Sequence, residues 1–102
     1  MKYVVMVETR LNGSPSENME ALKNVQEVFA KWTPPEGVTL EFHERLDGGG
    51  TFVVAEGDDI EAMFLPALQF NPWVKATYYP VATTLDQGTA LNQKAIDWHD
   101  SL

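Results

Sequence analysis

Ionisable side chains cluster in one short stretch, EFHERLDGGG, which spans residues 41–50. Glu41, His43 and Arg45 alternate there, so in an extended strand they would lie on one face of a sheet. A histidine between charged groups can serve a bound molecule as an acid, a base or a hydrogen-bond donor. The same spacing also fits a strand end whose charges face water, and the pattern leaves both interpretations open.

The three glycines that close the stretch, residues 48–50, could form either a phosphate cradle or a turn. A phosphate-binding glycine loop leads into a helix N-terminus, whose free N–H groups hold the anion. Here the glycines lead into TFVV, which is rich in strand-forming residues. We therefore predict a hairpin turn between strands at 38–46 and 51–56.

A loop of two or four residues fixes which side chains of this hairpin share a face. The expected pairs are Arg45 with Phe52, His43 with Val54, Glu41 with Glu56, and Leu46 with Thr51. One face then carries Glu41, His43, Arg45 and Glu56 beside Phe52 and Val54. The other carries Leu40, Phe42, Leu46, Val53 and Ala55, with Glu44 as a polar misfit.

The mixed face is the candidate ligand-binding surface, and His43 is the best candidate for a catalytic role. Trp73 and Tyr78 are aromatic residues that could line the same pocket, with the phenol available to a ligand. A metal site is an alternative, with three ligands from Glu41, His43 and Glu56. Only the expected strand register brings these residues together, so we assign no metal. No cofactor motif is present.

The elements that must position these residues follow a recognisable order. Strand character covers residues 2–10, 38–46, 51–56 and 73–83, and apolar residues at helical spacing cover 15–32 and 60–70. Ser14 and Glu17 have the spacing of a capping box, and Asp58 with Glu61 repeats it. The order β-α-β-β-α-β predicts an α+β, ferredoxin-like split βαβ domain with a four-stranded antiparallel sheet.

Residues 85–102 are expected to form a C-terminal helical extension beyond a domain at 1–84. Its apolar stripe consists of Leu91, Ala95, Trp98 and Leu102. Such a stripe must be buried somewhere, and we expect it on the helix layer or on a partner chain, so that it assists assembly.

Composition excludes several classes of function. The formal charge of −8 and the scattered bases argue against nucleic-acid binding. The chain has no cysteine, which excludes thiol catalysis and thiolate metal sites. No signal-peptide pattern or long apolar run is present, so we predict a cytoplasmic protein without membrane partners.

The segment PPEGVTLEFHERLDGGGTFVVAEGDD, with a later tyrosine–proline–valine strand, resembles domain-of-unknown-function family 3303. Its most specific part is the PPEGV lead-in, His43, the glycine turn and the spacing of Val54, Glu56, Asp58 and Asp59. The resemblance covers roughly residues 2–84 and implies the dimeric α+β barrel superfamily. Relatives there include cofactor-independent monooxygenases, muconolactone isomerases and stress-responsive barrel proteins.

These observations lead to a small-molecule-binding protein with a pocket between the sheet and helices of a dimeric α+β barrel. A non-catalytic interaction or regulatory module is the alternative, and a cofactor-independent monooxygenase-like enzyme is a third reading. Whether the chain is an enzyme is left open. We also expect a homodimer, because two helices cover one sheet face while the strands are apolar on both.

Overall fold

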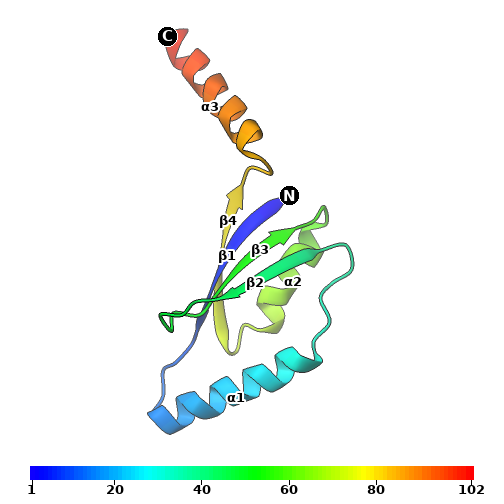
Figure 1. Ribbon diagram of the computed structural model, residues 1–102, viewed down its shortest axis with the longest axis vertical. Coiled ribbons are helices and arrows are strands. Elements are labelled where there is room, and N and C mark those ends of the chain that lie inside the picture. The colour runs from blue at the N-terminus through cyan, green and yellow to red at the C-terminus, as the bar shows by residue number, and fades with distance from the viewer.

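A computed structural model describes residues 1–102 and confirms the expected order of elements (Figure 1). The strands are β1 (Lys2–Thr9), β2 (Thr39–Glu44), β3 (Thr51–Glu56) and β4 (Val74–Val81). The helices are α1 (Pro15–Lys31), α2 (Ile60–Gln69) and α3 (Leu85–Asp100). The result is an α+β, ferredoxin-like arrangement with a C-terminal helix.

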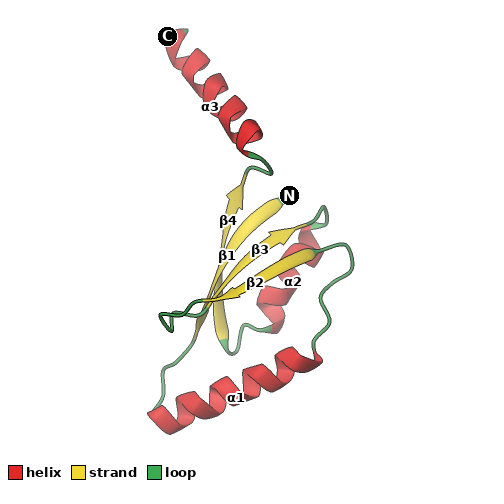
Figure 2. Ribbon diagram, viewed as in Figure 1, coloured by secondary structure: helices red, strands yellow, loops and turns green.

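The four strands form one antiparallel sheet in the order β2-β3-β1-β4 (Figure 2). β1 is therefore a central strand that pairs with β3 on one side and β4 on the other. Pro80 lies on β4, an edge strand, which is where a residue without an N–H donor is tolerated.

The register of the β2–β3 hairpin differs from the expected one by two residues. His43 pairs with Phe52 and Glu41 with Val54, while Thr39 rather than Glu41 faces Glu56. The strand ends at Glu44, so Arg45 and Leu46 belong to the turn. A shift of two residues preserves which side chains share a face, because side chains alternate with a period of two.

The glycines form the turn of this hairpin, as expected. The N–H of Arg45 donates to the carbonyl of Gly50 over 2.8 Å, and the loop between the two strands is longer than two residues. Asp47 accepts hydrogen bonds from Arg45 and from the Gly49 N–H, which together hold the pKa of its carboxyl below the usual range. Leu46, expected on the apolar face, is fully exposed at the tip.

Both main helices begin at side-chain caps. Ser14 and Glu17 form the predicted capping box at α1, each satisfying a free N–H of the other residue. At α2 the cap is Asp59 and not Asp58, and Asp59 accepts from the N–H of Glu61 over 3.0 Å. Local sequence therefore fixes where these helices start to within one residue.

The core lies between α2 and the sheet and is small. Four residues are buried: Val5, Val53, Ala55 and Met63. They come from the two central strands and from the middle of α2, and half-buried neighbours such as Tyr3, Phe64 and Tyr78 pack around them. α1 adds no buried residue to this core.

α3 projects away from the rest of the chain beyond the end of β4 (Figure 1). Its apolar stripe is open to solvent, with Leu91, Trp98 and Leu102 all more than half exposed. Of the two expected locations of this stripe, the helix layer of its own chain is not the one observed, and packing on a partner chain stays a prediction. The radius of gyration of 17.5 Å exceeds the roughly 13 Å of a compact 100-residue domain.

No helix combines the length and the apolar character that crossing a membrane would require.

Replacing Gly50 tests the turn. Its φ of +118° is a conformation that L side chains rarely adopt, and an added Cβ would overlap the carbonyl oxygen of Val7. We expect Gly50→Ala to lower the free energy of unfolding by about 3 kcal/mol or more, as measured by urea unfolding. Gly48→Ala is the control, because φ is +79° there but the space is open, and the expected loss is about 1 kcal/mol.

Candidate functional site

The alternation of side chains along the strands gives the sheet two different faces. The inner face, toward α1 and α2, carries Val5 and Val7 of β1, and the outer face carries Val4 and Met6. The same parity places Leu40, Phe42 and Glu44 on the inner face of β2, and Glu41 and His43 on its outer face. Sequence reasoning assigned these residues of β2 to their correct faces.

An apolar cavity of about 500 Å³ lies between the inner face and the two main helices. Of its 22 lining residues, 16 are hydrophobic, which is the usual character of a small-molecule site. α1 contributes Leu22, Val25, Gln26 and Phe29, and α2 contributes Met63, Pro66 and Ala67. All four strands supply the floor.

Aromatic contacts attach the C-terminal end of α1 to the sheet and to the end of α2. Phe29 makes an edge contact with Phe42 of β2 at 5.3 Å between ring centroids. Trp32 packs edge-on against Phe70, at the end of α2, at 5.4 Å, and its indole N–H donates to Gln69 over 3.0 Å. These contacts hold the C-terminal end of α1, while Met19 near its start is more than half exposed.

Few polar groups line the cavity. Glu44 is the one ionisable carboxylate, and its Oε2 accepts a hydrogen bond from the Thr51 hydroxyl over 3.1 Å. The Tyr78 hydroxyl donates to the carbonyl of Met63 over 2.9 Å, and burial raises the pKa of this phenol. The lining is thus suited to holding an apolar body beside one negative charge.

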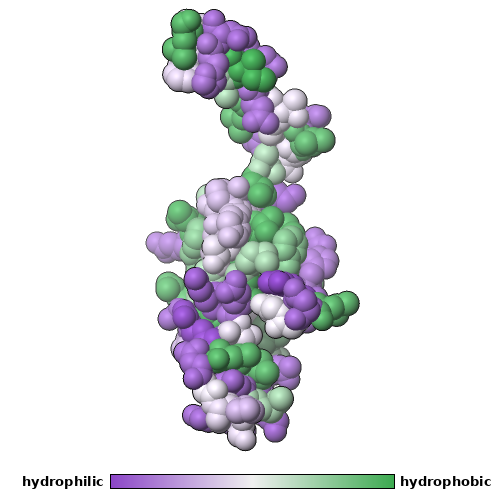
Figure 3. All heavy atoms as spheres, turned by 90° about the vertical axis from the view of Figure 1, so that its left-hand side faces the viewer, coloured by the Kyte–Doolittle hydropathy of each residue, from purple (hydrophilic) through white to green (hydrophobic).

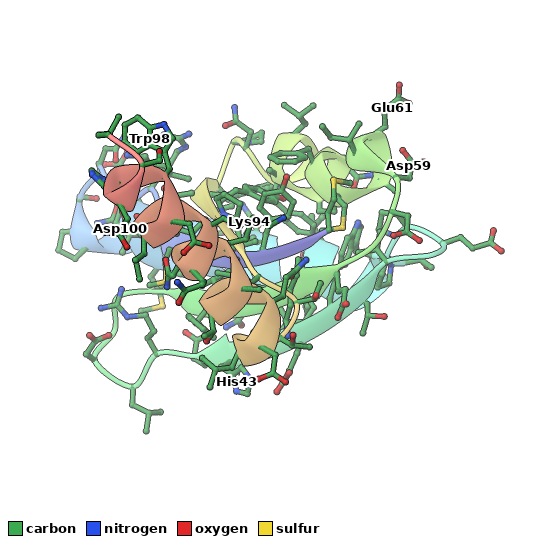
Figure 4. The ribbon with its side chains drawn as sticks, turned by 90° about the horizontal axis from the view of Figure 1, so that it is seen from above. His43, Asp59, Glu61, Lys94, Trp98 and Asp100 are labelled. Atoms are coloured by element: carbon green, nitrogen blue, oxygen red, sulfur yellow. The ribbon has the colours of Figure 1, made fainter.

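The structure separates the residues proposed from the sequence as ligand contacts. Tyr78 lines the cavity, whereas Glu41, His43, Arg45, Glu56 and Trp73 do not. In Figure 4, His43 lies on the opposite side of the sheet from Asp59 and Glu61 at the start of α2. Trp73 lies in the loop between α2 and β4, where its carbonyl accepts the N–H of Arg10. Any ligand role of His43 therefore concerns the outer face and stays a prediction.

On the outer face, His43 and Glu41 contact each other. His43 Nε2 lies 2.9 Å from Glu41 Oε1, and both side chains are more than half exposed. Glu56 is not opposed to Glu41, so the expected repulsion between two facing carboxylates does not arise. No group of three or more histidine, aspartate or glutamate side chains is arranged to hold a metal.

The centre of the outer face is apolar. Its side chains come from β1, β3 and β4, and no helix of the chain lies over them. We call this surface the outer-face patch: Val4, Met6, Phe52, Val54, Thr77 and Tyr79. Charged residues such as Lys2, Glu41 and Glu56 lie around its edge.

Apart from Tyr78, sequence reasoning did not name the residues that line the inner-face cavity as ligand contacts. Glu44 was noted as a polar misfit among apolar neighbours, and that misfit was the available signal. Nothing in the sequence marked Gln26 and Phe29 of α1 as cavity-lining residues, because α1 has the ordinary pattern of apolar and polar positions of an amphipathic helix.

The partly buried Tyr78 hydroxyl predicts how the stability of the protein changes at alkaline pH. An unfolded chain releases the phenolic proton near pH 10, whereas burial keeps the folded form protonated to higher pH. Above pH 10 the folded state holds more protons than the unfolded state, so the free energy of unfolding falls as pH rises. Tyr78→Phe should reduce this fall in urea unfolding from pH 8 to 11, and at pH 8 it should cost about 1 kcal/mol because Met63 loses its donor.

Tyr79→Phe is the matched control, since this neighbouring tyrosine belongs to the other face and its hydroxyl makes no hydrogen bond within the chain. An alkaline decline of equal size in the unaltered protein and in Tyr78→Phe would contradict the assignment.

Comparison with known proteins gives one family match. A search of curated proteins and a search of solved structures each returned no match. The model of a domain of unknown function, DUF3303, matches residues 1–95, which extends past Thr84 into α3. Because the match covers nearly the whole sequence, the chain belongs to the DUF3303 family.

Proposed function

We propose that this protein binds a small, largely apolar molecule in the cavity on the inner face of the sheet. The observation that carries the proposal is the cavity of about 500 Å³ with its mostly hydrophobic lining. Ligand pockets commonly measure about 300–1,000 Å³ and combine an apolar wall with a few polar groups. The inner-face cavity has both properties, and its polar groups include Gln26, Glu44, Thr51 and Tyr78.

The attachment of α1 supports ligand entry. The helix contacts Phe42 and Phe70 through aromatic rings at its C-terminal end, whereas its first turns make no aromatic contact, and no residue of the helix is buried. A helix held at one end can move at the other without breaking the core formed by α2 and the central strands. The N-terminal half of α1 is thus the expected gate of the cavity.

We further propose that two copies associate through the outer-face patch, which corresponds to the dimeric α+β barrel expected from the sequence. The patch is apolar at its centre and charged at its edge, the usual pattern of a protein interface. With four buried residues in 102, the isolated chain leaves most of its apolar side chains partly open. A face-to-face dimer would cover the sheet on both sides.

α3 would add to the same assembly. Figure 3 shows hydrophobic side chains among hydrophilic ones on a projection that stands clear of the body. The 16 residues of α3 span about 24 Å at 1.5 Å per residue, which is comparable to the length of a strand of the sheet. A second copy is within reach of this helix, whereas its own outer face is not covered by it.

Filling the cavity tests the binding proposal. N-phenyl-1-naphthylamine, an uncharged probe that fluoresces in apolar surroundings, should bind the full chain with a saturable increase in emission. Ala76→Phe places a ring in the cavity lining and should weaken binding at least about tenfold, because the probe and the new ring compete for one space.

Thr77→Phe is the matched control, since the neighbouring residue on the same strand belongs to the outer face. It should leave probe binding unchanged. Absence of saturable binding to the unaltered protein, or equal loss in both variants, would contradict the inner-face site.

A charge in the outer-face patch tests the dimer. Sedimentation equilibrium at micromolar concentration should give the unaltered chain twice its mass of 11.4 kDa. Val54→Lys should shift the protein to the single-chain mass, because it buries an unpaired charge, and removal of residues 85–102 should weaken association. Glu56→Lys is the control on the same strand, at the exposed edge of the patch. A mass near 11.4 kDa for the unaltered chain would refute the dimer.

A further inference from the structure

The charge distribution in the inner-face cavity indicates which ligands it favours. Among all the lining residues, Glu44 is the one with a formal charge, and no lysine, arginine or histidine is present. The inference drawn from this charge rests on the proposed function, because it concerns the ligand of the same cavity.

Glu44 is the last residue of the edge strand β2, where it is exposed at the rim of the inner-face cavity and has no cationic partner. The Thr51 hydroxyl donates to Oε2, and Oε1 accepts no hydrogen bond from the chain. The adjacent Arg45 turns to Asp47 instead, and the other carboxylate of the strand, Glu41, contacts His43 on the opposite face. The charge of Glu44 is therefore available to a ligand.

Aromatic rings also line the cavity, and one of them, Phe42, neighbours Glu44 on the inner face of β2. Phe42 is two residues before Glu44 on the same face of β2, and it contacts Phe29. Phe29 in turn stacks near Trp32 at 5.8 Å and lies 6.1 Å from Phe70. The faces of such rings carry partial negative charge and attract cations within about 6 Å.

We propose that the inner-face cavity is selective for hydrophobic organic cations, with the ammonium group at Glu44 and the apolar body among the rings. An anion of the same shape would meet a carboxylate and no compensating base. An uncharged analogue would fill the same space but form no ion pair with Glu44. We therefore expect the site to bind a cation most tightly, an uncharged analogue less tightly and an anion least tightly.

Three probes of equal length separate these cases: octylamine, octanol and octanoate. Each is used to displace N-phenyl-1-naphthylamine from the full chain at pH 7 and 150 mM salt, where the amine is charged and the acid ionised. Octylamine should bind at least about fivefold more tightly than octanol, as expected for a partly exposed ion pair aided by aromatic rings. Octanoate should bind more weakly than octanol.

Glu44→Gln should make octylamine and octanol bind equally while keeping the hydrogen bond from Thr51. Glu41→Gln is the control on the same strand: it removes an equal charge from the outer face and should leave the preference unchanged. This control matters because a chain with a net charge of −8 attracts any cation weakly.

The outcomes distinguish this inference from the proposed function. Equal displacement by octylamine and octanol in the unaltered protein would overturn the cation preference but keep the cavity as a binding site. A preference that persists in Glu44→Gln would also overturn it. If the fluorescent probe itself fails to bind, the proposed function fails first. The comparison among the three probes needs no variant, so a folding defect in Glu44→Gln would not remove the test.

Discussion

Pairing of β1 on both of its edges is the constraint on which the rest of the structure depends. β3 and β4 hold this strand by antiparallel ladders along nearly its whole length, so its side chains must alternate between the two faces. The sequence YVVMV has no polar residue in its middle, and both faces of the sheet centre are consequently apolar. The chain therefore needs cover on two sides, and its two main helices are both on one.

The two faces of the sheet differ in how they are covered. On the inner face, Met63 of α2 packs into Val5, Val53 and Ala55, but α1 is attached through the rings of Phe29 and Trp32 at its C-terminal end. The space left beneath α1 is the cavity. On the outer face, no element of the chain covers the patch, and α3 extends away from it. We propose that a ligand fills the cavity on the inner face and that a second copy of the chain covers the patch on the outer face.

Sequence reasoning predicted much of this architecture for identifiable reasons. The order of elements followed from periodicity, and the capping box of Ser14 and Glu17 located the start of α1. The hairpin faces were correct although the pairs were not, because Arg45 and Leu46 belong to a longer turn and the slip was an even number of residues. Which face the helices cover could not be predicted, since both faces are apolar. For that reason the ligand site was assigned to the side of His43, and the cavity lies on the side of Glu44. Nothing local to α3 specified where it would dock.

Valine methyl resonances give the most direct test of the central claim, that one face binds ligand and the other binds a second copy. Consecutive residues report on opposite faces: Val5 and Val53 on the inner face, Val4 and Val54 on the outer. In methyl NMR spectra, octanol at constant protein concentration should shift the resonances of Val5 and Val53. Dilution of the protein without ligand should shift those of Val4 and Val54. If octanol perturbs the outer pair, or dilution perturbs the inner pair, the division between the two faces is contradicted.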